Sequence, residues 1–291
     1  GIKKLLAGET IVYDVANKRI KEHKRFFIKP ISNKKFDPEE FRNMVHKTVK
    51  MCSIGQRKIG VFLSGGLDSS IVAYELNKLM PPAITFTNKI DPCPPAIHED
   101  YNSDANMAEL LAKENKFLHT EVQITPRTII NSWNDAIYYM EQPMYNQSIA
   151  MYCYTNKVLH DNGIVVTMAG DMGDEILGGY PKYWKLRRDN QSPIKKFKNW
   201  AAVINKWILR IKRPITNINA FNIQYNPILV DKNTLCDELL KCYPDDLWNP
   251  EDPVASYMAL DCITQVPEEF FNRNDKYGMA YGMEGRFPLA T

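Results

Sequence analysis

The stretch GVFLSGGLDSS at residues 60–70 constrains the fold of this chain more than any other feature. It begins within the short apolar run 58–63, whose β-forming residues predict a buried strand. The residues behind it, 69–79, carry apolar side chains at helical spacing, and Asp68 and Ser69 are good helix N-caps. The stretch therefore predicts a strand, a glycine-rich turn and a helix, which together form one βα unit.

The turn between this strand and this helix is typical of an anion site. Gly65 and Gly66 allow positive φ and a close approach of a ligand to the backbone. The helix start adds unpaired N–H groups and a partial positive charge at the same place. A phosphate group is the most natural ligand for such a turn.

The spacing of the turn excludes two common phosphate-binding motifs. The chain has no G-K-S/T as in a Walker A loop, and adjacent glycines do not fit G-x-G-x-x-G. The pattern S-G-G-x-D-S-S resembles the PP-loop of ATP pyrophosphatases, which cut ATP to AMP and pyrophosphate. A plain Gly/Ser turn before a helix is the alternative.

The rest of the chain alternates strands and helices. Strands are predicted at 83–87, 118–124 and 163–170, and strand fragments at 9–15 and 24–28. Helices are predicted at 38–54, 104–115, 127–141 and 148–162, and the pattern from 182 to 280 is mostly helical. This alternation predicts an α/β fold with a doubly wound, mostly parallel sheet that binds ligands at the carboxyl ends of its strands.

Composition narrows the class of protein. Of the 291 residues, 44% are apolar and 24% are charged, as is ordinary for a soluble globular protein. No apolar run reaches the length of a membrane span and no signal peptide is evident, so we expect a cytoplasmic protein without a membrane partner. The six cysteines form no C-x-x-C and lack zinc spacing, so we interpret them as reduced structural thiols.

Positive charge is concentrated in residues 182–213, which hold eleven Lys or Arg residues and one acid, Asp189. One interpretation is a surface for phosphates, nucleic acid or anionic lipid. The other is the solvated side of an amphipathic helix, because apolar residues between 200 and 211 fall at helical spacing.

A second glycine-bearing turn, AGDMGDEILGGY at 169–180, follows the predicted strand 163–170. Its acids Asp171, Asp174 and Glu175 repel one another unless a cation or a basic group lies between them. Mg²⁺ suits such a site because it takes oxygen ligands from carboxylates and phosphates together. The alternative is an acidic helix N-terminus that the helix dipole favours.

A third stretch, NRNDKYGMAYGMEGRFPL at 272–289, mixes basic and acidic residues. Its basic residues are Arg273, Lys276 and Arg286, and its acids include Asp275 and Glu284. Taken alone, it would be a mixed-charge helix and loop.

Together these stretches resemble the synthetase domain of glutamine-dependent asparagine synthetases. SGGLDSS is similar to the PP-loop of the family, and GDMGDEILGGY to its G-D/E-G-x-D-E-x-F/L-G-G-Y element. NDKYGMAYGMEGRFPL is similar to D-R/K-x-S-M-A-x-G-x-E-x-R-x-P-F-L-D. EQPMYNQSIAMY at 141–152 is similar to D-E-P-x-x-D-x-S, and YMALDCITQVPEEFFNRND at 257–275 to Y-x-D-x-x-x-x-L-P-E-x-x-L-x-R-x-D. The resemblance covers nearly the whole chain and implies a five-stranded sheet of the adenine nucleotide alpha-hydrolase type with a C-terminal helical region.

The resemblance also implies roles for single residues. Lys276 would stabilise charge on the α-phosphate, and Asp171 would lie where ammonia attacks. Asp68 and Asp174 would hold Mg²⁺. The residues implied to bind ATP or its pyrophosphate are Phe62, Ser64, Gly65, Gly66, Leu67, Asp68, Ser69, Ser70 and Gly170. Candidate substrate-binding residues are Glu141, Ser148, Glu175 and Arg286.

The implied function is that of an ATP-dependent amide-forming ligase. It would adenylate a carboxylate, with the aspartate side chain as first candidate, and transfer ammonia derived from glutamine to give asparagine, AMP and pyrophosphate. The alternatives are a β-lactam synthetase-like enzyme or peptide cyclase on the same scaffold, a PP-loop enzyme acting on tRNA, and a nucleotide-binding protein without turnover. Nucleic acid is not expected as a partner, and a homodimer stays open.

The chain also departs from the family pattern. It begins at Gly1 and has no cysteine before Cys52, whereas the glutaminase half of the family uses an N-terminal cysteine, so we expect that domain to be missing or in another chain. We interpret 1–34 as a remnant of that domain and its linker, and 35–291 as the ATP pyrophosphatase domain, with a variable, mostly helical region at 182–270. The chain ends FPLAT, where the pattern reads P-F-L-D. Gln142 and Asn146 stand where acids are usual and Gly278 replaces a serine, so these changes concern the acyl substrate more than ATP.

Overall fold

A computed structural model describes residues 4–27, 35–91, 102–142, 144, 146, 148–191 and 252–291. The chain forms two compact units. Unit 1 contains Gly1–Lys34 and Asp174–Gln265, and unit 2 contains Lys35–Gly173 and Val266–Thr291. The glycine-rich turn at 64–66 and the third stretch at 272–289 both lie in unit 2.

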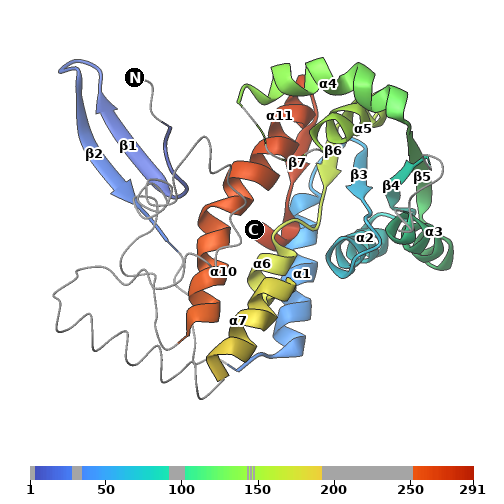
Figure 1. Ribbon diagram of the computed structural model, residues 1–291, viewed down its shortest axis with the longest axis horizontal. Helices are drawn as coiled ribbons and strands as arrows, with labels where there is room; N and C mark the ends of the chain where they lie inside the picture. The colour runs from blue at the N-terminus through green and yellow to red at the C-terminus, as the bar shows by residue number, and fades with distance from the viewer. Residues whose placement is uncertain are drawn as a thin grey trace. The chain divides into compact units, whose positions relative to one another are not determined.

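The centre of unit 2 is a five-stranded sheet with the order β5-β4-β3-β6-β7, in which every neighbouring pair is parallel (Figure 1). The strands are β3 Ile59–Phe62, β4 Ile84–Ile90, β5 Leu118–Ile124, β6 Val166–Met168 and β7 Glu284–Arg286. This confirms the predicted α/β fold with a five-stranded, mostly parallel sheet. The sequence pattern did not locate the fifth strand, because β7 has only three residues and shows no alternation.

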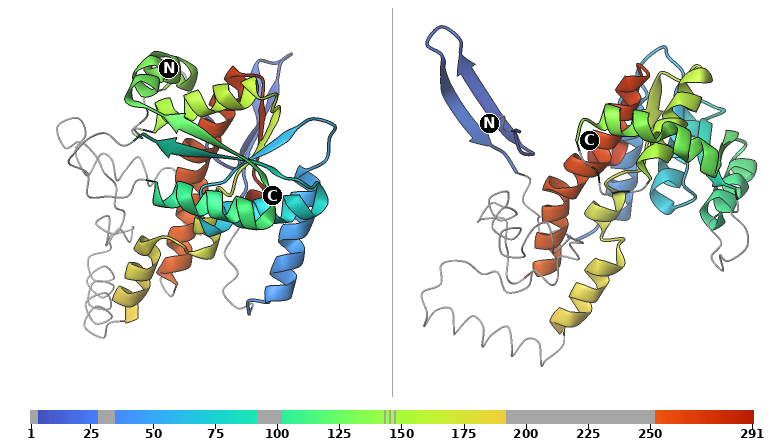
Figure 2. Two further views of the ribbon diagram at one scale, coloured as in Figure 1. Left: turned by 90° about the vertical axis from the view of Figure 1, so that its right-hand side faces the viewer. Right: turned by 45° about the horizontal axis from the view of Figure 1, so that its top comes forward.

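Helices cover both faces of this sheet, as a doubly wound fold requires (Figure 2). One face packs against α1 Pro38–Cys52, α2 Leu67–Leu79 and α3 Ser103–Asn115. The other packs against α4 Pro126–Met140 and α5 Ile149–Asp161, and α11 Asn272–Ala280 joins these two helices. The π-helix η2 Val266–Phe271 leads directly into α11, and the 3-10 helix η3 Pro288–Ala290 contacts α1.

Two apolar cores hold the sheet between these layers. The first includes Val49, Val61 and Val72, each fully buried. The second includes Phe86 and Leu159. Burying a side chain of this size stabilises the fold by about 1.5–3 kcal/mol, so both layers are held firmly and the strand ends lie at fixed positions.

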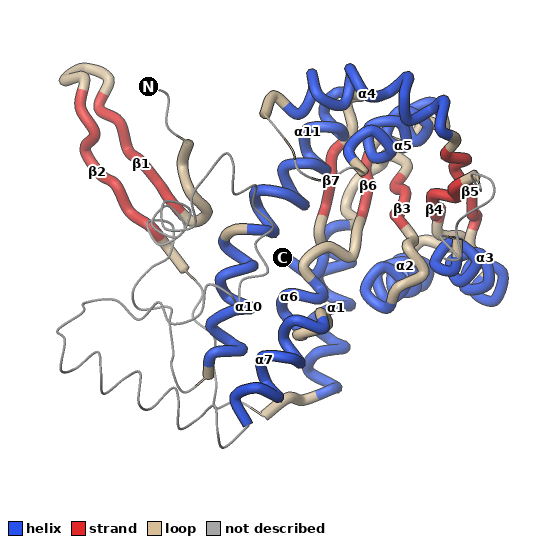
Figure 3. Tube along the Cα trace, viewed as in Figure 1, coloured by secondary structure: helices blue, strands red, loops and turns tan. Residues whose placement is uncertain are grey.

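Unit 1 contains a hairpin and three described helices (Figure 3). The strands β1 Glu9–Asp14 and β2 Arg19–Arg25 pair antiparallel, with a register shift between Val12 and Tyr13. The helices are α6 Gly173–Leu177, which starts at the unit boundary, α7 Pro181–Gln191 and α10 Pro253–Ile263. The first fragment predicted near the N-terminus became β1, whereas β2 begins five residues before the predicted 24–28.

Part of the predicted basic segment falls in α7. Lys182 lies 2.6 Å from the Asp261 carboxylate and over the Tyr180 and Tyr183 rings, so it is not a solvated surface cation. The amphipathic pattern at 200–211 lies outside the described residues. Among the helices that the structure describes, none has the length and apolar character needed to cross a membrane.

Candidate active site

The glycine-rich turn lies at the carboxyl end of β3, and hydrogen bonds of its own serine hydroxyls hold its shape. The Ser69 hydroxyl accepts a hydrogen bond from the Ser64 N–H at 3.1 Å and donates to the Gly66 carbonyl at 3.2 Å. The Ser70 hydroxyl donates to the same carbonyl at 2.6 Å. The N-cap of α2 is Gly66, and no side chain caps it, so the expectation that Asp68 and Ser69 are N-caps was wrong. Both lie inside the first turn, because the helix begins at Leu67.

The two glycines of the turn have different surroundings. Gly65 has φ of +82°, and a Cβ there would overlap the backbone of α3, with Asp104 C at 3.1 Å and Ala108 N at 3.2 Å. A Cβ on Gly66 would meet only the Ser64 hydroxyl, at 3.3 Å. Leu67 is 72% exposed. The turn is therefore packed against α3 on the Gly65 side and open on the Gly66 side, where a ligand can approach the backbone.

The second turn lies beside the first, because β6 is the neighbour of β3. A Cβ on Gly170 would be 2.5 Å from Ser69 N, so the chain after β6 passes directly over the start of α2. A Cβ on Gly173 would be 2.7 Å from a carboxylate oxygen of Asp68. The structure thus brings together Phe62, Ser64, Asp68, Ser69 and Gly170 at one edge of the sheet.

The acids of the second turn belong to both units of the chain. Asp171 accepts a hydrogen bond from Asn274 at 2.8 Å in unit 2, whereas Glu175 is buried in unit 1, where Tyr180 hydrogen-bonds it. Burial raises the pKa of the Asp174 carboxyl. Within the described part of the chain, no group of three or more His, Cys, Asp or Glu side chains could share a metal ion. A Mg²⁺ site here would need oxygen ligands from phosphates as well.

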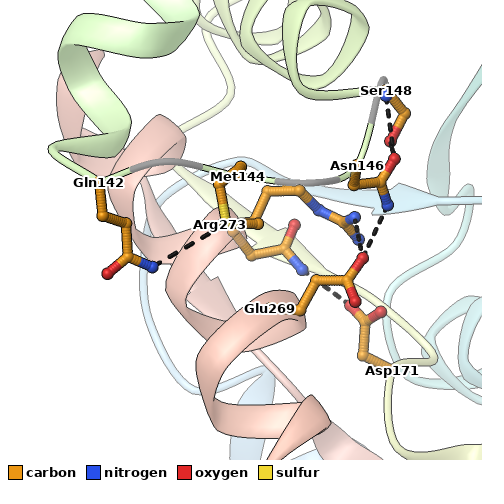
Figure 4. A network of polar contacts seen from close by, with 8 residues as sticks. Gln142, Met144, Asn146, Ser148, Asp171, Glu269 and Arg273 are labelled. Atoms are coloured by element: carbon orange, nitrogen blue, oxygen red, sulfur yellow. Dashed lines mark hydrogen bonds and ion pairs between the residues drawn. The ribbon is translucent and has the colours of Figure 1, made fainter. Parts of the chain in front are cut away.

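A network of polar side chains continues from Asp171 (Figure 4). The Asn146 amide donates to the Glu269 carboxylate at 2.7 Å, and the Ser148 N–H and hydroxyl donate to the Asn146 carbonyl oxygen at 2.9 and 2.6 Å. Glu269 lies 3.6 Å from the Arg273 guanidinium. The loop before α5, η2 and α11 meet here, next to the turn after β6.

Arg273 is the cation at the centre of this network. Only 3% of it is exposed, its guanidinium lies 3.8 Å from the Tyr152 ring centre, and its Nε–H has no hydrogen-bond partner. Burying an arginine with unused donors is costly unless an anion lies close by. The sequence pattern pointed to Arg273 only as one charge among several, and its partners could not be read from it.

Asp171 is the acid that burial affects most directly in this network. Burial raises the pKa of its carboxyl, while the Arg273 charge and the Asn274 hydrogen bond oppose that rise. A carboxyl whose pKa lies above its usual range accepts a proton more readily near neutral pH.

The remaining predicted residues lie in different places. Lys276, on α11, forms an ion pair with Glu141, the C-cap of α4, which has a positive φ of 57°. Arg286 donates to the carbonyls of Cys52 and Ile54 at 2.6 and 2.9 Å, so it ties β7 to the end of α1. The structure does not bring Arg286 to the polar network.

Comparison with known sequences identifies the family of this chain. The asparagine synthase family model matches residues 40–291. Asparagine synthetase B (glutamine-hydrolyzing) of Escherichia coli strain K12 is 25% identical over 235 residues, covering 78% of this chain and 42% of that protein. A putative asparagine synthetase 2 (glutamine-hydrolyzing) of Methanocaldococcus jannaschii is 26% identical over 234 residues, covering 74% and 40%. The chain thus spans less than half the length of these relatives.

Two solved structures align over most of the chain with low similarity. The U34-tRNA thiolase NcsA from Methanococcus maripaludis is 14% identical with a TM-score of 0.36, covering 86% of this chain and 81% of that one. The NMN synthetase from Francisella tularensis is 15% identical with a TM-score of 0.36, covering 84% and 95%. These likenesses are too low to support an argument, so the assignment depends on the sequence match. Because that match covers residues 40–291, the protein belongs to the asparagine synthase family.

Proposed function

We propose that this protein is an ATP-dependent amide-forming ligase that adenylates a carboxylate and transfers ammonia to it. The aspartate side chain is the first candidate substrate, and asparagine, AMP and pyrophosphate would be the products. The observation that carries the proposal is the turn SGGLDSS at the carboxyl end of β3, packed against α3 through Gly65 and open at Gly66. Family membership supports the ligase class.

The proposed nucleotide site uses the edge of the sheet near β3 and β6. Backbone around Phe62 and Gly170 would hold adenine and ribose. The N–H groups and hydroxyls of residues 64–70 would bind the pyrophosphate, because the helix start and the open backbone favour anions. Asp68 and Asp174 would hold Mg²⁺, whose preferred ligands are carboxylate and phosphate oxygens. When bound, this ion would neutralise charge on the departing pyrophosphate.

The proposed reaction has two steps. In the first, a carboxylate oxygen attacks the α-phosphorus, and the bond between that phosphorus and the pyrophosphate oxygen breaks. Lys276, once separated from Glu141, would stabilise the charge that develops. In the second, ammonia attacks the acyl carbonyl, the bond to the AMP oxygen breaks, and Asp171 would take a proton from the attacking nitrogen. The protein contributes mainly position and charge.

The proposal does not fix which carboxylic acid is the acyl substrate. Gln142 and Asn146 are neutral amides where the family pattern has acids, and Asn146 belongs to the network beside Asp171. Because of these two amides, the assay should use a panel of carboxylic acids, with aspartate first, and not aspartate alone.

The test is AMP and pyrophosphate release from Mg-ATP with ammonium and each acid, followed by omission of one component at a time. Acid-dependent release of AMP with formation of the amide supports the proposal, and Asp68→Asn should abolish it. Glu114→Gln, which changes an exposed acid on α3, is the matched control. Release of ADP and phosphate, or AMP release that no acid alters, would contradict it.

A further inference from the structure

The Glu269 carboxylate in the polar network comes from a sequence position that none of the motifs assigns to an acid. The segment 141–148 has Asn146 where its motif has an acid. Glu269 occupies a position that the lead-in motif at 257–275 leaves free, four residues before Arg273. The structure brings these two residues into contact, since the Asn146 amide donates to the Glu269 carboxylate at 2.7 Å (Figure 4).

The hydrogen bonds fix which way the Asn146 amide points. Its oxygen accepts from both the N–H and the hydroxyl of Ser148, so its nitrogen must face Glu269. An aspartate at 146 would place a second carboxylate oxygen at this contact. Two carboxylates at hydrogen-bond distance cannot both stay ionised without a large cost. An aspartate at 146 would therefore have to share a proton with Glu269, whereas the Asn146 amide donates to it without this cost.

The carboxylate of Glu269 faces a small set of charged groups. These are Arg273 at 3.6 Å and the Asp171 carboxyl, and the neutral Tyr152 ring lies against the same guanidinium. Arg273 is buried and its Nε–H is unpaired, so its position depends on the anions around it. Glu269 forms an ion pair with this guanidinium at 3.6 Å, and the charge of Arg273 also acts on Asp171.

We propose that Glu269 supplies the carboxylate that this motif usually supplies from position 146, and that Asn146 is the positioning residue that aims it at Arg273. The carboxylate then comes from η2, and the loop before α5 supplies the amide. The pair keeps Arg273 in place beside Asp171, on the side of the site that the acyl substrate would occupy. This role depends on the proposed function, whereas the pairing itself does not.

The experiment is an exchange of the two groups. Asn146→Asp, Glu269→Gln and the double variant are compared with the wild type, with Asn131→Asp, an exposed site on α4, as the charge control. Each single variant should raise the KM for the acyl substrate about tenfold or more, because a charged hydrogen bond is lost or reversed. The KM for ATP should stay within about twofold. The double variant restores one amide and one carboxylate, and its acyl KM should return to within about threefold of the wild type.

Thermal unfolding as a function of pH tests the pairing without turnover. In Asn146→Asp the two carboxyls would share one proton in the folded state, so the pKa of one of them lies above its unfolded value. The variant should therefore be most stable at low pH and lose stability as pH rises, relative to the wild type. The double variant and Asn131→Asp should not show this loss.

The outcomes separate the two claims. Recovery of both the acyl KM and the pH profile in the double variant supports the proposal. A double variant as impaired as the worse single variant overturns it. If the wild type shows no acid-dependent turnover, the proposed function fails and the positioning role fails with it. The unfolding profiles then still show whether residues 146 and 269 form an exchangeable pair.

Discussion

Gly65 and Gly66 are neighbours in the same turn, yet the structure predicts opposite consequences for replacing them with alanine. At Gly65 the new Cβ would overlap the backbone at the start of α3, and the φ of +82° disfavours any side chain. At Gly66 the backbone is extended, with φ of −77°, and the new Cβ would meet only the Ser64 hydroxyl. Gly65→Ala should therefore destabilise the fold, and Gly66→Ala should disturb the proposed nucleotide site.

The magnitude for Gly65→Ala follows from two costs and one gain. A left-handed non-glycine residue costs about 1–2 kcal/mol, and overpacking against backbone costs about 1–3 kcal/mol. The smaller conformational freedom of the unfolded alanine chain returns about 0.4–1 kcal/mol. The free energy of unfolding should fall by about 1–5 kcal/mol, which lowers the melting temperature by about 2–20 °C in a domain of this size. Gly66→Ala should change the free energy of unfolding by less than about 1 kcal/mol.

Two assays read these effects separately. Thermal unfolding followed by circular dichroism should show the loss in Gly65→Ala alone. Calorimetric titration with Mg-ATP should show that Gly66→Ala, still folded, binds at least about tenfold more weakly, because its methyl group would stand on the open side of the turn, where we propose that the pyrophosphate binds. The reasoning is refuted if Gly65→Ala is as stable as the wild type, or if Gly66→Ala binds ATP normally.

Three further variants test other parts of the account. Arg286→Met should lower the free energy of unfolding by about 2 kcal/mol, because it removes hydrogen bonds to the Cys52 and Ile54 carbonyls, and should leave ATP affinity unchanged in a titration. Asp171→Asn should remove turnover but raise the melting temperature above about pH 7. Burial raises the pKa of the folded carboxyl, so the wild type loses stability as pH rises from the unfolded pKa through the folded one, and the gain should vanish near pH 4. An equal gain at both pH values would contradict this cause. Lys276→Ala should lower turnover about a hundredfold with the fold intact, and normal turnover in a rate assay would exclude its catalytic role.

The sequence predicted the features that local patterns encode. The strand 118–124 agrees with β5 at both ends, and the turn after β3 has the strand, loop and helix that its residues indicated. The family resemblance is confirmed by the match over residues 40–291. These features depend on the spacing of nearby residues, which a single sequence displays.

The features that the sequence missed depend on distant partners. Asn146 and Glu269 are 123 positions apart, so neither pattern alone could pair them. The helix start was placed two residues late because Asp68 and Ser69 have cap-forming side chains, whereas the N-cap Gly66 has no side chain. Arg286 looked like a site residue because of its motif, but its guanidinium bonds the carbonyls at the end of α1. A charged residue within a motif indicates a role, but the sequence does not show which groups that residue contacts.

The most direct test of the account follows the oxygen atom of the carboxylate. The protein is incubated with Mg-ATP, ammonium and aspartate labelled with ¹⁸O in its side-chain carboxylate, and the AMP is analysed by mass spectrometry. If the carboxylate attacks the α-phosphorus, each amide formed leaves one labelled oxygen in AMP and none in pyrophosphate. Amide formation with unlabelled AMP, or label in released phosphate beside ADP, would show that the acid is not activated as an adenylate and would contradict the central claim.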